Sequence, residues 1–228
     1  MRSQSVRVAF AAVVLSLTCN SFAAPFVNLD FEQATVVPVG GGFIQAAAAF
    51  PGWTPRIGNS TISNAAYNTL SHEGPPRVSL FDVPTVVPVL QGQYMAALGS
   101  WAPFPEYSSL EQAGQVPADA LTIRMLANWY LGPPVVRMNG VIVPMQSLTP
   151  SVSNIGIFAG EISAFAGSTV LLQLSSGKPP SQIVVFDAIE FSPLPIPEPT
   201  AAVLTLGWTL RFFTRRSRSR RSMHRRAG

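Results

Sequence analysis

Hydrophobic and polar positions between residues 26 and 192 alternate in short runs, which are broken by glycine, proline, asparagine and serine. Runs of this length, separated by turn residues, are typical of the strands of a β-sandwich or barrel. No segment keeps a 3.6-residue hydrophobic period, which disfavours an α/β architecture. The sequence therefore predicts an all-β domain with strands in FVNLDFEQ (26–33), GGFIQAAAAF (41–50), RVSLFDV (77–83), QYMAALGS (93–100), LTIRMLANWYL (121–131), VVRMNGVIVPM (135–145), GSTVLLQLSS (167–176) and QIVVFDAIEFS (182–192).

Two local patterns sharpen this prediction. Asn139 and Gly140 lie between two β-branched runs, and Asn-Gly is favoured in the type I′ turn of a tight hairpin. The segment EISAFAG (161–167) predicts a short helical turn before the next strand. We find no internal repeat of fixed period.

The N-terminus has the parts of a secretory signal peptide. Arg2 and Arg7 precede the apolar run VAFAAVVLSL (8–17), and small residues follow, which predicts cleavage after Ala23. An apolar run of about ten residues is too short to span a bilayer core of about 30 Å as a helix. The single cysteine, Cys19, lies in this segment, so cleavage after Ala23 would leave a chain without thiol chemistry; a lipoprotein cysteine at Cys19 is the alternative.

Positive charge is concentrated at the two ends of the chain. Ten of the 15 Lys and Arg residues lie before residue 25 or after residue 197, which leaves five basic residues against ten acidic ones between them. The body thus carries a net charge near −5, and the formal charge of +4 belongs to the ends. A nucleic-acid-binding domain needs basic residues spread over a folded face, so this function is excluded.

The C-terminal end has three parts: a proline-rich linker, an apolar segment at 201–213, and a cluster of arginines. The apolar segment is short for a membrane span, and positive charge beyond it favours a cytoplasmic end. This order resembles the PEP-CTERM sorting signal of Gram-negative bacteria that make extracellular polysaccharide, although Trp208 and Arg211 depart from the usual apolar segment. The resemblance implies export to the envelope surface or matrix and cleavage by an exosortase, a membrane enzyme; the alternative is a plain C-terminal anchor. The residues that carry it are Pro197, Glu198, Pro199, Arg215 and Arg216.

The body opens with an Asn-x-x-Phe-Glu motif and a later Gly-Trp, and its last predicted strand contains Asp-x-Ile. The residues are Asn28, Phe31, Glu32, Gly52, Trp53, Asp187 and Ile189. This arrangement resembles the galactose-binding-like jelly-roll family, which includes many carbohydrate-binding modules. The resemblance implies a jelly-roll β-sandwich over residues 24–193, between a signal peptide (1–23) and the sorting signal (194–228).

In this family the first and last strands lie close and often hold a structural calcium ion. The residues that the resemblance assigns to such a site are Glu32 and Asp187, and calcium takes six to eight oxygen ligands. Asp30 and Glu190 fit less well, because an offset of one residue turns a side chain to the other face of a strand. The alternative is that Glu32 and Asp187 are solvated or cap loops; no other cofactor is expected.

A sugar site in such a fold needs an exposed aromatic platform with polar side chains beside it. Trp101 and Tyr107 lie in the proline-broken loop GSWAPFPEYSS (99–109) and are the candidate platform. Trp53 is expected to plug one end of the core instead.

Catalytic residues are not evident. His72, the one histidine of the body, stands between Ser71 and Glu73, but catalytic triads are assembled from separate loops rather than sequence neighbours. One histidine without cysteine also excludes the common zinc sites. The leading hypothesis is a non-catalytic surface or matrix protein that binds polysaccharide or envelope components. A secreted glycan hydrolase and a ligand-free structural protein are the alternatives.

Overall fold

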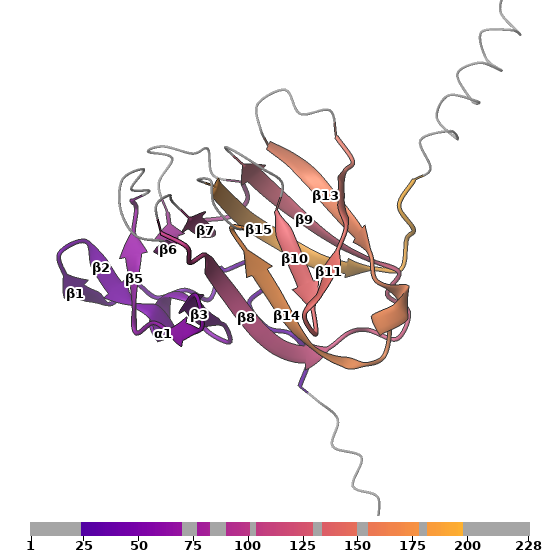
Figure 1. Cartoon of the computed structure of the whole chain (residues 1–228), viewed down its shortest axis with the longest axis horizontal. Coiled ribbons are helices and arrows are strands. Elements are labelled where there is room, and N and C mark those ends of the chain that lie inside the picture. Colours follow the sequence, from indigo (N-terminus) through magenta and orange to yellow (C-terminus); the bar gives the residue numbers. More distant parts are fainter. Residues whose placement is uncertain are drawn as a thin grey trace, which may run out of the picture.

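The computed structural model describes residues 24–69, 77–82, 90–100, 104–129, 134–149, 155–177 and 182–197. These residues form two facing β-sheets (Figure 1). Along the nine-stranded sheet the strands are, in order, β1 (Pro38–Gly40), β2 (Phe43–Gln45), β5 (Asn64–Tyr67), β6 (Arg77–Phe81), β7 (Met95–Ser100), β15 (Gln182–Ser192), β9 (Thr122–Trp129), β13 (Ile155–Glu161) and β12 (Met145–Ser147). Along the six-stranded sheet they are β11 (Val141–Val143), β10 (Val135–Met138), β14 (Thr169–Ser175), β8 (Ser108–Gln115), β3 (Thr54–Ile57) and β4 (Ser60–Thr61).

The larger of the two hydrophobic clusters among the described residues lies between the sheets. Alternate residues of β8 and β14, such as Leu110 and Leu172, bury their side chains from the six-stranded sheet. Ile123 and Phe186 do the same from the nine-stranded sheet, and all four are fully buried in one cluster. The prediction of a mostly β, two-sheet domain is confirmed.

The local patterns are confirmed as well. β10 and β11 form an antiparallel hairpin in which Met138 pairs with Val141. Asn139 and Gly140 between them have φ values of 50° and 80°, as a type I′ turn requires. The predicted helical turn is a 3₁₀ helix, Ser163–Phe165.

Two predicted strands are wrong. Residues 26–28 have no regular structure, and residues 29–33 form turns and a bend. Asn28 and Phe31 adopt left-handed φ values of 52° and 59°, which interrupt an extended chain. The segment 41–50 is a strand only at β2 and continues as a helical turn, α1 (Ala46–Ala49). Four successive alanines have the highest helix propensity and no β-branch, which explains this change.

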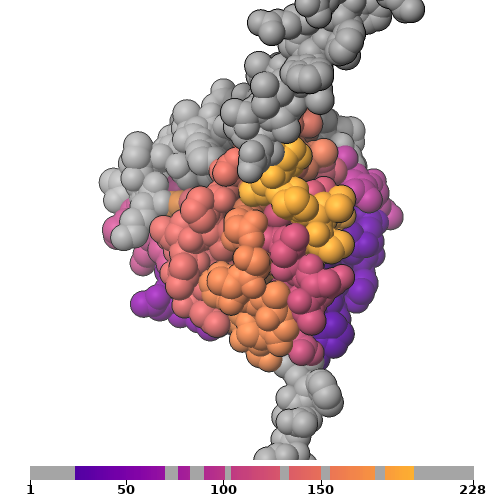
Figure 2. Space-filling view, turned by 90° about the vertical axis from the view of Figure 1, so that its right-hand side faces the viewer, coloured from indigo at the N-terminus to yellow at the C-terminus, as the bar shows by residue number. Residues whose placement is uncertain are grey.

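The two ends of the domain nevertheless meet. The ring of Phe26 stacks on that of Phe191 with centroids 5.0 Å apart, and the Ile189 amide donates to the Leu29 carbonyl at 3.0 Å. Figure 2 shows the indigo and yellow segments next to one another on this side of the molecule. Residues 26–33 therefore lie against β15 without forming a strand beside it.

Several predicted features lie outside the described residues. These are the signal peptide with Ala23, the apolar segment of the tail, and the residues Ser71, His72, Glu73, Trp101, Glu198, Pro199, Arg215 and Arg216. In the part of the chain that the structure does describe, no helix has the length and apolar character needed to cross a membrane.

Candidate functional site

The outer face of the six-stranded sheet carries four polar side chains, Arg56, Glu111, Gln173 and Arg137, which we call the polar row. They come from the neighbouring strands β3, β8, β14 and β10. Gln173 pairs directly with Glu111 on one side and with Arg137 on the other. Direct partners in a sheet point to the same face, and the inner face is occupied by the buried leucines, so the row faces outward.

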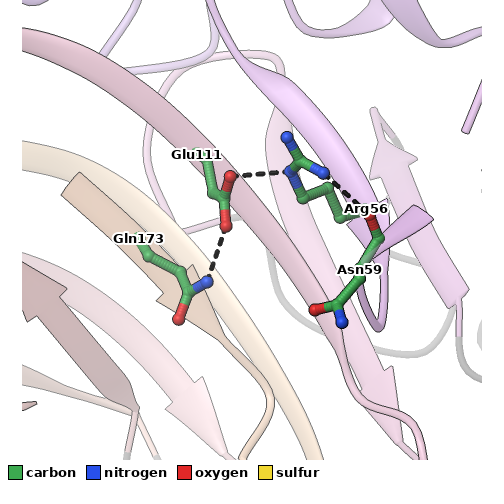
Figure 3. A network of polar contacts seen from close by, with 4 residues as sticks. All are labelled: Arg56, Asn59, Glu111 and Gln173. Atoms are coloured by element: carbon green, nitrogen blue, oxygen red, sulfur yellow. Dashed lines mark hydrogen bonds and ion pairs between the residues drawn. The ribbon is translucent and has the colours of Figure 1, made fainter. Parts of the chain in front are cut away.

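Hydrogen bonds link the four side chains into one network, of which Figure 3 shows Arg56, Glu111 and Gln173. Arg56 Nε contacts Glu111 Oε2 at 2.7 Å, and Gln173 Nε2 donates to Glu111 Oε1, also at 2.7 Å. Arg137 Nη1 donates to Gln173 Oε1 at 3.2 Å. Because the side chains hold one another, they are ordered before any ligand arrives, which lowers the entropic cost of binding.

The network leaves donors free. Toward the described residues, Arg56 uses Nε and Nη1, the latter on the Asn59 carbonyl at 2.9 Å, and Arg137 uses only Nη1. A guanidinium has five N–H groups, so within this part of the chain both arginines keep donors for a ligand. Arg56 is neutralised by Glu111, whereas Arg137 forms no ion pair with another described residue.

Tyr107, one of the two predicted platform residues, lies at the start of β8. The Gly58 amide donates to its carbonyl at 2.9 Å, which extends the pairing of β3 and β8 by one residue. Alternation along the strand then places Tyr107 on the same face as Ser109 and Glu111. Its side chain is half-buried, and Trp101 is outside the described residues.

The structure brings Glu32 and Asp187 to one loop, residues 91–94. Asp187 Oδ2 accepts the Gln91 amide at 2.8 Å, while Glu32 Oε1 accepts the amides of Gln93 and Tyr94 at 2.8 and 2.9 Å. Asp187 Oδ1 also accepts an amide, from Ala188, at 2.7 Å. Among the described residues the two carboxylates therefore clamp this loop, and we call the arrangement the carboxylate clamp.

Asp187 is fully buried, whereas Glu32 is exposed. The pKa of Asp187 is raised to about 7, mainly by burial; the amide hydrogen bonds from Ala188 and Gln91 partly oppose this shift, and the negative charges of Glu32 and Asp30 add to it. Neither clamp carboxylate forms an ion pair with a described cation. Within the described ranges no three His, Cys, Asp or Glu side chains gather at one point.

A second carboxylate network joins β5 and β6, the one parallel pair among the named strands. The Tyr67 hydroxyl donates to Asp82 Oδ2, and Asn68 Nδ2 donates to Asp82 Oδ1 at 2.7 Å. Burial, with the hydrogen bond to Asp82, raises the pKa of Tyr67 to about 12. Both oxygens of Asp82 are thus used within the fold, which indicates a structural role.

Sequence reasoning missed the polar row. The alternation in SSLEQAGQ and TVLLQLS places Glu111 and Gln173 outward, but nothing local shows that β8 and β14 are neighbours. The pairing of β3 with β8 is equally non-local. The sequence indicated that each side chain points outward, but it did not indicate that these strands are neighbours.

No protein-family model matches the chain, and no curated protein matches it either. Among solved structures, the chain is similar to a family 11 carbohydrate-binding module from Clostridium thermocellum in complex with a β-1,3-1,4-mixed-linked tetrasaccharide. The TM-score is 0.37 and the identity 12%, over 61% of this chain and 88% of that one. It is also similar to the enzymatically active domain of tailspike protein 4 of bacteriophage CBA120, with a TM-score of 0.34 and 12% identity, over 62% of this chain and 19% of that one.

Proposed function

We propose that the chain is an exported surface or matrix protein whose β-sandwich, of the galactose-binding-like jelly-roll type, binds extracellular polysaccharide without catalysis. The polar row is the observation that carries the proposal. It presents partly exposed planar hydrogen-bonding groups across four adjacent strands on the outer face of the sheet, with Tyr107 on the same face. Strands lie about 4.8 Å apart, so the row is long enough for several units of an extended glycan.

Hydroxyl groups of a sugar bind in pairs to planar groups such as guanidinium, carboxylate and carboxamide. The row supplies all three kinds, held in place by their own hydrogen bonds. Tyr107 would provide the aromatic surface on which the C–H face of a sugar ring packs. Glu111 lies between Arg56 and Gln173 and accepts from both, which suits a positioning role rather than proton transfer.

The proposal includes sorting by the C-terminal signal. Pro197 is exposed and follows the end of β15 at Ser192 by a few residues, so the linker leaves the sandwich directly after its last strand. An exosortase would act at Pro197–Pro199, and the arginine cluster with Arg215 and Arg216 would keep the far end in the cytoplasm. Replacement of Glu198 by Ala should leave uncleaved protein in the membrane fraction of an exosortase-bearing host, as measured by mass spectrometry. Normal cleavage of that variant would refute this part of the proposal.

The proposal also includes one structural calcium ion at the carboxylate clamp. A buried carboxylate beside a second carboxylate, with no cationic partner among the described residues, is an arrangement that a divalent cation stabilises. Oxygen atoms of Glu32 and Asp187 suit calcium, a hard cation. Since no third acid joins them within the described ranges, backbone carbonyls and water would have to complete the shell.

Binding is tested by affinity electrophoresis of the purified protein in gels containing dextran, mixed-linked β-glucan, xanthan or alginate. We expect retardation by at least one polysaccharide and at least tenfold weaker binding for Tyr107→Ala and Arg137→Ala. Arg124→Ala is the matched control, because Arg124 lies on the nine-stranded sheet and contacts the Leu194 and Pro195 carbonyls. Unchanged migration in every gel, or equal loss in all three variants, would overturn the proposal in favour of a structural role.

A further inference from the structure

A cavity of about 440 Å³ lies between the β1–β2–β5 end of the nine-stranded sheet and the β3–β4 end of the six-stranded sheet. Its lining comes from β1, β2, β5 and α1 on one side and from β3 and β4 on the other. This volume lies within the range of about 300–1,000 Å³ that small-molecule sites occupy. The cavity is a different place from the polar row, although Thr54 in its lining pairs with Glu111 in the next strand.

The lining carries no charge and combines apolar residues with neutral polar ones. Among the described residues around the cavity there is no Asp, Glu, Lys, Arg or His. Gln45, Thr61, Ser63 and Asn64 are all exposed, and no hydrogen bond joins the side chain of any of them to another described residue. A charged ligand would find no opposite charge here, whereas a neutral ligand with many hydroxyl groups would find both donors and acceptors.

Two carboxamides stand together at one wall. Gln45 and Asn64 are direct partners in the pairing of β2 with β5, so their side chains leave the sheet about 5 Å apart on the same face. Together they offer two carbonyl acceptors and two NH₂ groups. Their backbones are fixed by the ladder, and the Ala46 amide ties the start of α1 to the Ser63 carbonyl at 2.9 Å.

The inner end of the cavity is apolar and rigid. Trp53 is only 5% exposed, and its indole Nε1 donates to the Asn28 carbonyl at 3.0 Å, which fixes the ring. Pro55, also buried, lies beside it in the lining. An apolar floor beneath a rim of neutral hydrogen-bonding groups matches a sugar ring, which has C–H faces and a hydroxyl periphery.

From these observations we infer that the cavity is a second binding site, and that it takes a single neutral sugar unit. The carboxamides of Gln45 and Asn64 hold the hydroxyl groups, and Trp53 and Pro55 contact the ring. The site goes beyond the proposed function, because it needs neither the polar row nor the carboxylate clamp.

The test is NMR of the isotope-labelled protein with glucose, galactose, mannose and N-acetylglucosamine at millimolar concentration, and with glucuronate as the charged comparison. We expect shifts of the Gln45 and Asn64 side-chain amide signals with at least one neutral sugar. Asn64→Ala should weaken binding at least tenfold. Ala47→Trp, which fills the cavity from α1 without removing a polar group, should do the same. Gln146→Ala, an exposed glutamine on β12, is the matched control and should bind normally.

The outcomes separate this site from the polar row. Retention of sugar binding in Arg137→Ala, together with its loss in Ala47→Trp, supports a second site even if no polysaccharide binds to the sheet face. Absence of shifts with all four neutral sugars overturns the inference. So does binding that Asn64→Ala and Ala47→Trp leave unchanged, or stronger binding of glucuronate than of glucose.

Discussion

Glu32 and Asp187, from opposite ends of the domain, hold one backbone loop between them. Asp187 accepts the amide of Gln91, and Glu32 accepts the amides of Gln93 and Tyr94. Gly92 lies between these amides with a φ of 59°. The loop therefore depends on both carboxylates and on a residue without a side chain at its centre.

Gly92→Ala should destabilise the domain by disrupting the carboxylate clamp. A Cβ at this position would lie 2.2 Å from Glu32 Oε1, so Glu32 would have to move and lose its two amide hydrogen bonds. A left-handed φ lowers the free energy of unfolding by about 1–2 kcal/mol when the residue has a side chain. Urea titration should show that Gly92→Ala lowers the free energy of unfolding by a further amount of about 1–2 kcal/mol, through the lost hydrogen bonds.

Gly140→Ala supplies the matched control for Gly92→Ala. Gly140 has a similar left-handed φ of 80°, and no atom lies within 4 Å of the Cβ that the substitution would add. It should therefore report backbone strain alone. In a Glu32→Ala background the cost of Gly92→Ala should fall to that of Gly140→Ala. Equal costs for the two glycines in the unsubstituted protein would show that Glu32 does not constrain the loop.

Stability in the presence of a chelator should fall as the pH rises from about 4 to about 7. Burial raises the pKa of Asp187 to about 7, whereas an unfolded aspartate titrates near 3.9. Between these values the folded state keeps a proton that the unfolded state has lost, so raising the pH favours unfolding. The contribution of Asp187 to the free energy of unfolding is complete below about pH 4, and it is lost once the pH has passed through about 7.

Asp187→Asn, which cannot ionise, is the control for this pH dependence. Thermal unfolding of the variant in EDTA should show a flatter dependence on pH between 4 and 7. It should also be less stable at low pH, because its NH₂ group would face a backbone N–H donor instead of accepting from it. A slope identical to that of the unsubstituted protein would assign the titration to another group.

Calcium should raise the Tm, and the rise should grow with pH. A ligand that binds only the folded state, present at a concentration of one hundred times its Kd, raises the free energy of unfolding by about 2.7 kcal/mol. The ion competes with the proton at Asp187, so the effect should be larger at pH 8 than at pH 6. Differential scanning fluorimetry with calcium, magnesium and EDTA measures this. An equal Tm rise in Glu32→Gln would rule out the clamp as the calcium site.

The sequence predicted those parts of the fold whose signals are local. The left-handed turn at Asn139 and Gly140, the 3₁₀ turn at Ser163–Phe165 and the burial of Trp53 each follow from residues within a short window. The error at residues 26–33 has a physical cause: Phe31 is apolar and extended by propensity, but it adopts a positive φ while fully buried against Phe50 and Trp53. Tertiary packing outweighed the local preference.

The candidate sites also differ in whether the sequence alone could identify them. Glu32 and Asp187 were selected through a family resemblance, and the structure places both at one loop, although metal binding there stays a prediction. The polar row and the cavity depend instead on which strands are neighbours. That order follows from the shared core, in which β8 lies between β3 and β14, and no periodicity along the chain encodes it.

Glu111→Ala should cost more stability than Arg56→Ala. Removing Glu111 takes away the carboxylate to which both Arg56 and Gln173 donate, whereas removing Arg56 leaves the bond from Gln173 to Glu111 in place. The side chains of Arg56 and Glu111 are 31% and 13% exposed, so a double-mutant cycle should give a coupling of only about 0.5–1 kcal/mol. Glu190→Ala, at an exposed position of β15, is the control in the same urea titrations. A coupling near zero would mean that the ion pair does not order the polar row.

Trp53→Phe should weaken the calcium response although Trp53 is far from either carboxylate in the chain. Its Nε1 donates to the carbonyl of Asn28, whose side chain accepts the Gln33 amide at 3.0 Å, so the indole helps to fix the turn that carries Glu32. Loss of this buried donor should cost about 1–3 kcal/mol. Leu174→Val, which removes a methylene group from the same core on β14, should lower stability but preserve the Tm shift on adding calcium. A calcium shift that survives equally in both variants would separate the turn at residues 28–33 from the site.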